Sequence, residues 1–235
     1  MVRVVRGLGW TLVVAGCVVL LYVVYLLWFT GLETAQEQRD LADRFDRLTA
    51  GEPDDADGVG ADGDDEDRGA DDEIEVEVGD AFAAMWFERE GERVVTDDVL
   101  IVVEGTSLAD LKRGPGHYPG SADVGGEGNL GIAGHRTTYG EPFGRLDELR
   151  DGDTIHVVDR SGVEWVYAYR EQRIVAPTDT WVVEEADPID LGAPTITLTT
   201  CHPRFSAAQR LIAWGELVGS PGSDEPAVTT SSADA

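Results

Sequence analysis

Cysteine is scarce in this chain, since only two of the 235 residues are Cys. Cys17 lies within a long apolar run near the amino end, so Cys201 is the only cysteine in the remainder of the chain. A structural disulfide within that remainder is therefore excluded. The count alone leaves two interpretations of Cys201 open, a small buried hydrophobe or a reactive thiol.

Basic residues are also few, with 18 Lys and Arg against 46 Asp and Glu and a formal net charge of −28. Such a charge argues against a nucleic-acid partner, because it repels the phosphate backbone. Residues 51–80 alone hold 15 acids and one base, Arg68, so this segment supplies half of the net charge. It has almost no apolar residue before Ile74, and we predict a disordered acidic linker.

Charge is absent from residues 7–30, a run of 24 residues dominated by Val, Leu and aromatics. At about 1.5 Å per helical residue, such a run crosses a bilayer core of roughly 30 Å. Its length and the lack of a small-residue cleavage site favour an uncleaved anchor over a removed signal peptide. Because Arg3 and Arg6 precede it, we expect a single-pass membrane protein with a cytoplasmic amino end and an extracellular body.

The remaining segments show two different patterns of apolar residues. Leu41, Phe45 and Leu48 recur at helical spacing, whereas the region from Ala81 onward has short apolar runs separated by Gly, Pro and Asp. This region is predicted to be a mostly β domain, with a closed or nearly closed barrel as the preferred form. The predicted segments are a cytoplasmic start and transmembrane anchor at 1–31, a juxtamembrane helix or stalk at 32–50, the acidic linker at 51–80, the β domain at 81–219 and a disordered tail at 220–235.

One stretch, TITLTTCHPRFSAAQR at 195–210, carries the candidate chemistry. Strand alternation places Ile196 and Leu198 on one face and Cys201 on the other, with three of the threonines. Cys201 therefore need not fill the core, and it ends a strand, where a side chain is readily presented to a cleft. A nucleophilic thiol also needs a proton-transfer partner and a nearby positive charge.

Four histidines are candidate partners for this thiol. His156 falls in mid-strand and is interpreted as structural, and His202 adjoins Cys201, from which it points away on an extended chain. The loop residues His135 and His117 remain as candidate acids or bases.

The segments AGHRTTYGEPF and TLTTCHPRFSAAQR resemble sortases, the membrane-anchored cysteine transpeptidases of Gram-positive surfaces. The family's Thr-Leu-x-Thr-Cys strand is present at 197–201, its histidine matches His135, and its arginine matches Arg210 rather than the rival Arg204. The motifs HRTTYG and GPGHYPG are most similar to those of class E sortases of high-GC Gram-positive bacteria. The resemblance covers about residues 81–219.

This resemblance implies an all-β fold, a closed eight-stranded barrel with short helices, and a two-step acyl transfer. Cys201 would attack the Thr carbonyl of a Leu-Pro-x-Thr-Gly or Leu-Ala-x-Thr-Gly sorting signal on a secreted protein, with cleavage between Thr and Gly. His135 would exchange protons with the departing and incoming amines, Arg210 would hold the substrate and stabilise the oxyanion, and the Thr200 region would line that pocket. The acceptor would be a cell-wall precursor amine, and this chemistry needs no metal or organic cofactor.

Tyr118 and Tyr139 are candidates to shape the pocket for the second residue of the signal, with a core or loop role as the equal alternative. Three other functions stay open. One is a different extracellular cysteine acyl-transferase or peptidase, such as an L,D-transpeptidase, although that family has His where Thr199 stands here. The second is a membrane-tethered β domain that binds a partner without catalysis, and the third is a zinc site, whose ligands would be Cys201, His202, His135 and His117.

Overall fold

The computed structural model describes residues 2–50 and 80–219, without the side chains of 2–5, 8 and 23–30. The predicted acidic linker, apart from Asp80, and the predicted tail at 220–235 lie outside these residues. Within them, no helix combines the length and the apolar character needed to cross a membrane. The anchor predicted at 7–30 is therefore without structural support, and part of it falls among the side chains that are not described.

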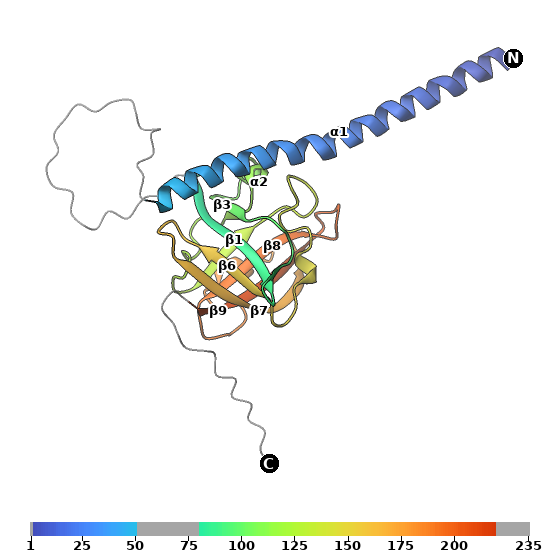
Figure 1. The fold of residues 1–235 in the computed structure, drawn as a ribbon. Coiled ribbons are helices and arrows are strands. Elements are labelled where there is room, and N and C mark those ends of the chain that lie inside the picture. The colour runs from blue at the N-terminus through green and yellow to red at the C-terminus, as the bar shows by residue number, and fades with distance from the viewer. Residues whose placement is uncertain (1, 51–79, 220–235) are drawn as a thin grey trace, which may run out of the picture.

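Eight strands close into a barrel, as predicted (Figure 1). Their order is β1-β3-β4-β5-β8-β9-β7-β6, and β6 pairs with β1 to complete the ring. A ninth strand, β2, has two residues and pairs with the end of β1. The strands are β1 Ala81–Arg89, β2 Glu92–Arg93, β3 Leu100–Glu104, β4 Gly116–His117, β5 Asn129–Ala133, β6 Thr154–Val158, β7 Glu164–Val175, β8 Thr195–His202 and β9 Gln209–Gly219.

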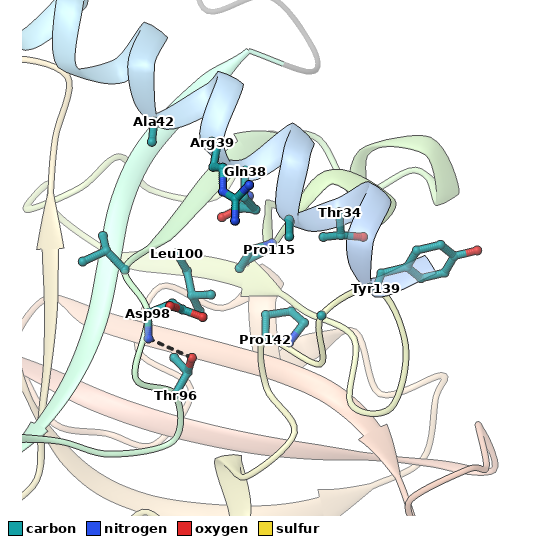
Figure 2. A pocket seen from close by; sticks show the side chains of 15 residues that line it. Thr34, Gln38, Arg39, Ala42, Thr96, Asp98, Leu100, Pro115, Tyr139 and Pro142 are labelled. Carbon is teal, nitrogen blue, oxygen red and sulfur yellow. Dashed lines mark hydrogen bonds between the residues drawn. The ribbon is translucent and has the colours of Figure 1, made fainter. Parts of the chain in front are cut away.

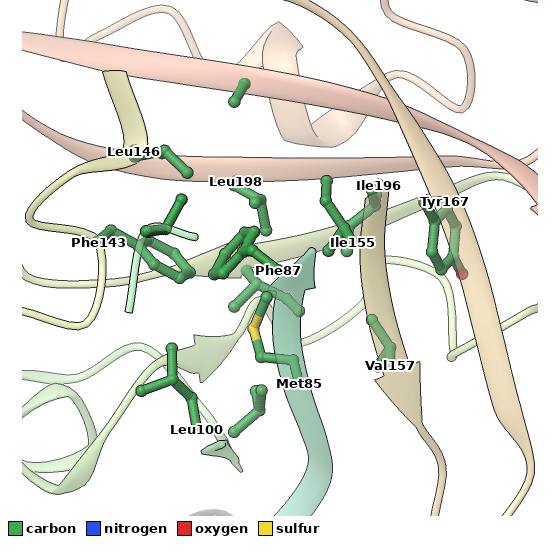
Figure 3. Packing of buried hydrophobic residues seen from close by; sticks show 14 of the residues in the cluster. Met85, Phe87, Leu100, Phe143, Leu146, Ile155, Val157, Tyr167, Ile196 and Leu198 are labelled. Carbon is green, nitrogen blue, oxygen red and sulfur yellow. The ribbon is translucent and has the colours of Figure 1, made fainter. Parts of the chain in front are cut away.

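The barrel interior is a single apolar cluster (Figure 3). Phe87 and Phe143 meet edge to face there, with ring centroids 6.1 Å apart. Ile196 and Leu198 enter the same cluster from β8, as the alternation of that strand predicts. On the other face of β9, Ile212 and Trp214 form a smaller cluster with residues of the short helix α3, Trp181–Glu184.

Three further helical elements decorate the barrel. Helix α2, Leu108–Arg113, begins with a capping box between Ser107 and Asp110. The connection between β5 and β6 holds the 3-10 turn η2, Leu146–Glu148. Helix α1, Val2–Thr49, runs as one element through the predicted anchor and the predicted stalk.

The second half of α1 lies across the barrel, while its first half extends beyond it (Figure 1). Leu41 and Phe45 are 2% and 3% exposed and pack on Ala81 and Ala84 of β1, together with residues of β3. Small alanines on β1 allow this close approach of the helix. The segment 32–50 is therefore docked on the barrel wall and does not stand free as a stalk.

Candidate active site

Cys201, the candidate nucleophile, is the penultimate residue of β8. The six residues from Thr195 to Thr200 are buried, whereas Cys201 is half-exposed and forms no disulfide. Its strand partner in β9 is Arg210, directly opposite in the antiparallel ladder. Side chains of directly opposed residues project to the same face of a sheet, so the thiol and the guanidinium share one face.

Arg210 is held by backbone oxygens of the β8–β9 connection. Its Nη1 donates hydrogen bonds of 3.0 Å to the carbonyls of Ala207 and Gln209. No carboxylate in the described ranges forms an ion pair with it, so its charge is not neutralised by the protein there. The rival Arg204 differs, because it forms a 2.8 Å ion pair with Glu141.

His135 reaches the same level from the other side of β8. Strands β5 and β8 are parallel, with Ala133 beside Thr199. The Gly134 amide continues the ladder by donating to the Thr199 carbonyl at 3.0 Å, and the Thr200 hydroxyl donates to the Gly134 carbonyl at 2.7 Å. This register, extended by two residues beyond Ala133 and Thr199, brings His135 level with Cys201.

The imidazole of His135 is half-buried, and one of its nitrogens lacks a hydrogen bond within the described residues. Its Nε2 is buried and has no hydrogen-bond partner among the described residues. Desolvation by this burial lowers the pKa of His135 below its ordinary value. A neutral ring with a free nitrogen is suited to accepting and returning a proton.

The other three histidines are occupied elsewhere. His117, the rival acid or base, is 4% exposed, stacks on Phe82 with centroids 4.0 Å apart, and places Nδ1 2.7 Å from a Glu104 carboxylate oxygen. His156 lies 2.7 Å from Glu164 through Nδ1. His202 Nδ1 accepts a hydrogen bond from an arginine.

That arginine, Arg136, has a role that the sequence reasoning missed. It is 3% exposed, and its Nη1 donates to His202 Nδ1 at 2.8 Å and to the Cys201 carbonyl at 3.4 Å. Its Nη2 forms a 2.9 Å ion pair with Asp147 in η2. Arg136 thus ties the chain next to His135 to the backbone of Cys201. In the sequence, only its position directly after His135 could have indicated that Arg136 belongs to the site.

The remaining predicted site residues surround this strand end. The Tyr118 hydroxyl lies 2.9 Å from the Thr199 hydroxyl, on the same face of β8 as Cys201. Thr200 is 3% exposed and points to the opposite face, with its hydroxyl engaged by Gly134. Tyr139 lies beside His135, with ring centroids 4.9 Å apart.

The predicted zinc ligands do not come together as a set. Across residues 2–50 and 80–219, no group of three or more His, Cys, Asp and Glu side chains is arranged to hold a metal ion. His117 in particular is committed to Glu104 and Ser121.

The fold is a closed eight-stranded barrel, and its candidate site lies at the end of one strand. The site offers a half-exposed thiol, an imidazole with a free nitrogen and a guanidinium. These features are those of a β-barrel protein whose chemistry depends on one cysteine. A sortase domain model matches residues 95–218, which is more than half of the chain. The chain belongs to the sortase family.

Two sortases of Streptomyces coelicolor are similar over most of this chain. Sortase SrtE2 is 31% identical over 231 residues, which cover 92% of this chain and 83% of that relative. Sortase SrtE1 is 30% identical over 229 residues, and the match spans 91% of this chain but only 57% of the relative's length. A crystal structure of sortase E1 from the same organism, with a tripeptide in its active site, superposes with a TM-score of 0.53 at 30% identity, covering 63% of this chain and 96% of that one.

Proposed function

We propose that this chain is a class E sortase, a membrane-anchored cysteine transpeptidase. It cleaves a sorting signal of the Leu-Pro-x-Thr-Gly or Leu-Ala-x-Thr-Gly type between Thr and Gly on a secreted protein. It then transfers the acyl group to an amine of a cell-wall precursor. The observation that carries this proposal is the arrangement at the end of β8: the free thiol of Cys201 stands opposite Arg210, and His135, whose Nε2 has no hydrogen-bond partner among the described residues, follows the neighbouring strand β5.

In the first half-reaction, neutral His135 accepts the proton of the Cys201 thiol as Sγ attacks the Thr carbonyl carbon. The carbonyl oxygen becomes an oxyanion beside the guanidinium of Arg210, which stabilises the developing charge. The C–N bond then breaks, the departing glycine amine takes the proton from His135, and a thioester remains on Cys201. The lowered pKa of His135 favours this step, because its imidazolium gives up a proton readily.

In the second half-reaction, the acceptor amine attacks the thioester carbonyl. Neutral His135 accepts a proton from that amine as the new amide bond forms. Cys201 leaves as a thiolate and takes the proton back from His135, so the thiol and the neutral imidazole of the starting state are restored. If water replaces the amine, the same steps hydrolyse the signal.

Tyr118 and Tyr139 are proposed to shape the pocket for the second residue of the signal. This role is supported by the Tyr118 hydroxyl, which lies within hydrogen-bond distance of Thr199, two residues before the nucleophile on the same face of β8. The tripeptide in the active site of sortase E1 from S. coelicolor supports a peptide ligand at the corresponding place here. We propose that Thr200 lines the adjoining pocket wall indirectly, by holding Gly134.

Membrane attachment of the amino-terminal segment is part of the proposal. It is supported by the 24 uncharged residues at 7–30 and by exposed apolar side chains on α1, including Trp10 at 68% and Leu21 at 67%. Large exposed apolar surfaces on soluble monomers are uncommon. The orientation follows from Arg3 and Arg6, with the barrel on the extracellular side of the cell membrane.

The test is a ligation assay on the full-length chain in detergent. A quenched Leu-Ala-x-Thr-Gly peptide is incubated with a glycine-type amine, and cleavage and ligation products are separated by mass. Cys201→Ala is compared with Cys17→Ala, the matched change at the other cysteine, and Arg210→Met is compared with Arg204→Met.

We expect cleavage and ligation to vanish in Cys201→Ala and to persist in Cys17→Ala. Arg210→Met is expected to lose about 100-fold in kcat/KM, comparable to the removal of one oxyanion donor, while Arg204→Met retains most activity. Cleavage without ligation would indicate a peptidase. Peptide binding that survives in Cys201→Ala, with no turnover in the wild type, would indicate a binding domain and refute the proposal.

A further inference from the structure

Gln38, a polar residue of α1, forms hydrogen bonds with backbone groups of the barrel domain. The Gln38 amide nitrogen donates to the carbonyls of Ile101 and Arg113 at 2.9 and 2.8 Å, and its oxygen accepts from the Ile101 amide at 2.8 Å. These three hydrogen bonds satisfy backbone groups on β3 and at the last residue of α2. Gln38 therefore fixes the position of the helix along the barrel wall.

One turn earlier, α1 meets the loop that carries His135. Thr34 is 4% exposed and donates to the Lys112 carbonyl at 2.8 Å. Its methyl carbon lies 3.6 Å from the place that a Cβ on Gly140 would occupy, so Gly140 of the loop is a close neighbour of the helix. The Lys112 ammonium lies 5.8 Å from the centre of the Tyr139 ring.

A pocket of about 300 Å³ opens between the helix and this loop (Figure 2). Thr34, Gln38 and Arg39 line it from α1, whereas Tyr139 and Pro142 line it from the loop. Figure 2 shows Thr34 and Tyr139 near the same stretch of α1. Movement of the helix would thus change the surroundings of Tyr139 directly.

The loop itself needs external support. Tyr139, Gly140 and Glu141 have φ angles of 52°, 77° and 50°, three successive residues in the left-handed region. Two of these residues have a Cβ, for which this conformation is unfavourable and persists only where the surroundings impose it. Tyr139 in turn contacts His135, with ring centroids 4.9 Å apart.

We propose that the docked half of α1, residues 31–49, is a positioning element of the active site, which holds the Tyr139–Gly140 turn and through it the His135 imidazole. Gln38 fixes the helix on β3 and α2, and Thr34, one turn away, lies beside Gly140, the neighbour of Tyr139 in the loop. The helix that leads from the proposed anchor is thereby part of the catalytic unit. This inference rests on the proposed function, because it assigns His135 a role in turnover.

The decisive comparison is Gln38→Leu with Gln36→Leu in the full-length chain in detergent. Both make the same chemical change on α1, but Gln36 is exposed, whereas Gln38 makes the three hydrogen bonds described above. The measurements are kcat and KM for ligation of the Leu-Ala-x-Thr-Gly peptide across pH, and thermal unfolding of each variant. Thr34→Ala, which removes one hydrogen bond and the methyl group near Gly140, is a milder second variant.

We expect Gln38→Leu to lower kcat about tenfold or more, since small displacements of reacting groups have effects of this size, with KM little changed. The pH-profile limb assigned to His135 should move to higher pH, because a loosened loop admits water to the ring and raises its pKa toward the ordinary value. Thr34→Ala should shift both quantities in the same direction by less, and Gln36→Leu should match the wild type.

A merely structural helix would lower the unfolding temperature of Gln38→Leu and leave kcat of the folded protein and the pH profile unchanged, which would overturn the inference. If Gln38→Leu does not fold, Thr34→Ala decides by the same two readouts. A wild type without ligation activity would refute the proposed function, whereas an active wild type with unaltered helix variants would refute this inference alone.

Discussion

Replacement of Arg136 by methionine tests whether this buried guanidinium fixes the strand end that carries Cys201. Arg136→Met retains much of the side-chain length and removes the charge. It leaves His202 Nδ1 and the Cys201 carbonyl without their donor, at 2.8 and 3.4 Å in the wild type, and breaks the 2.9 Å pair with Asp147.

The size of the effect follows from these three contacts. The bond to His202 involves a charged donor and a largely enclosed site, for which about 1.5–3 kcal/mol is typical. The contact at 3.4 Å is long and adds little. Asp147 is 50% exposed and becomes hydrated again, so its loss is near the surface-pair value of about 1 kcal/mol or less. We therefore expect the free energy of unfolding to fall by about 2–4 kcal/mol.

Urea denaturation measures this change, with Arg170→Met as the matched control. Arg170 pairs with Glu216 at 2.6 Å, but its side chain is 40% exposed, so its loss should cost about 1 kcal/mol or less. Ligation by folded Arg136→Met should fall about tenfold or more, because the Cys201 backbone is less well fixed. Equal stability and activity of the Arg136 and Arg170 variants would refute this reasoning.

Three further predictions concern the surroundings of the site. Because burial lowers the pKa of His135, the unfolded chain binds a proton more readily, so wild-type stability falls as pH drops below about 6.5; urea titrations of His135→Asn should show a smaller fall. A Cβ on Gly134 would lie 2.5 Å from the Phe143 ring, so Gly134→Ala should destabilise by about 1–3 kcal/mol, whereas Gly219→Ala, with no neighbour nearer than 3.6 Å, should not. Asn129→Ala removes the buried amide that accepts from two Thr hydroxyls of β8, and thermal unfolding should show a loss of about 2–4 kcal/mol.

The strands most open to prediction were those with one apolar and one polar face or with a continuous β-branched run. β8 begins with the predicted alternating stretch TITLTTC and extends it by one residue, to His202. β1 has no such alternation, because both of its faces are buried, one in the barrel interior and one under α1.

The contacts that complete the site depend on tertiary structure that local patterns do not encode. Gln38 and Ile101 are 63 residues apart in the chain, and Arg136 and His202 are 66 apart. Helical spacing predicted that the segment 32–50 has an apolar stripe, but it did not indicate which surface that stripe would contact. The placement of Arg136 likewise required the β5–β8 register and the position of η2.

The threonine face of β8 explains why a cysteine at this one position is presented to substrate. Along that face, Thr195, Thr197 and Thr199 are all buried, with hydroxyls bound to Asn129 or Tyr118. Tyr118 bonds the last of these threonines, Thr199. Cys201, two residues after Thr199, is the first side chain on this face that is half-exposed. A hydroxyl face can be sealed by specific hydrogen bonds and still end at a defined residue, whereas an apolar face would favour burial of the thiol as well. The polar alternation in TITLTTC thus sets both the strand and the place where its thiol emerges.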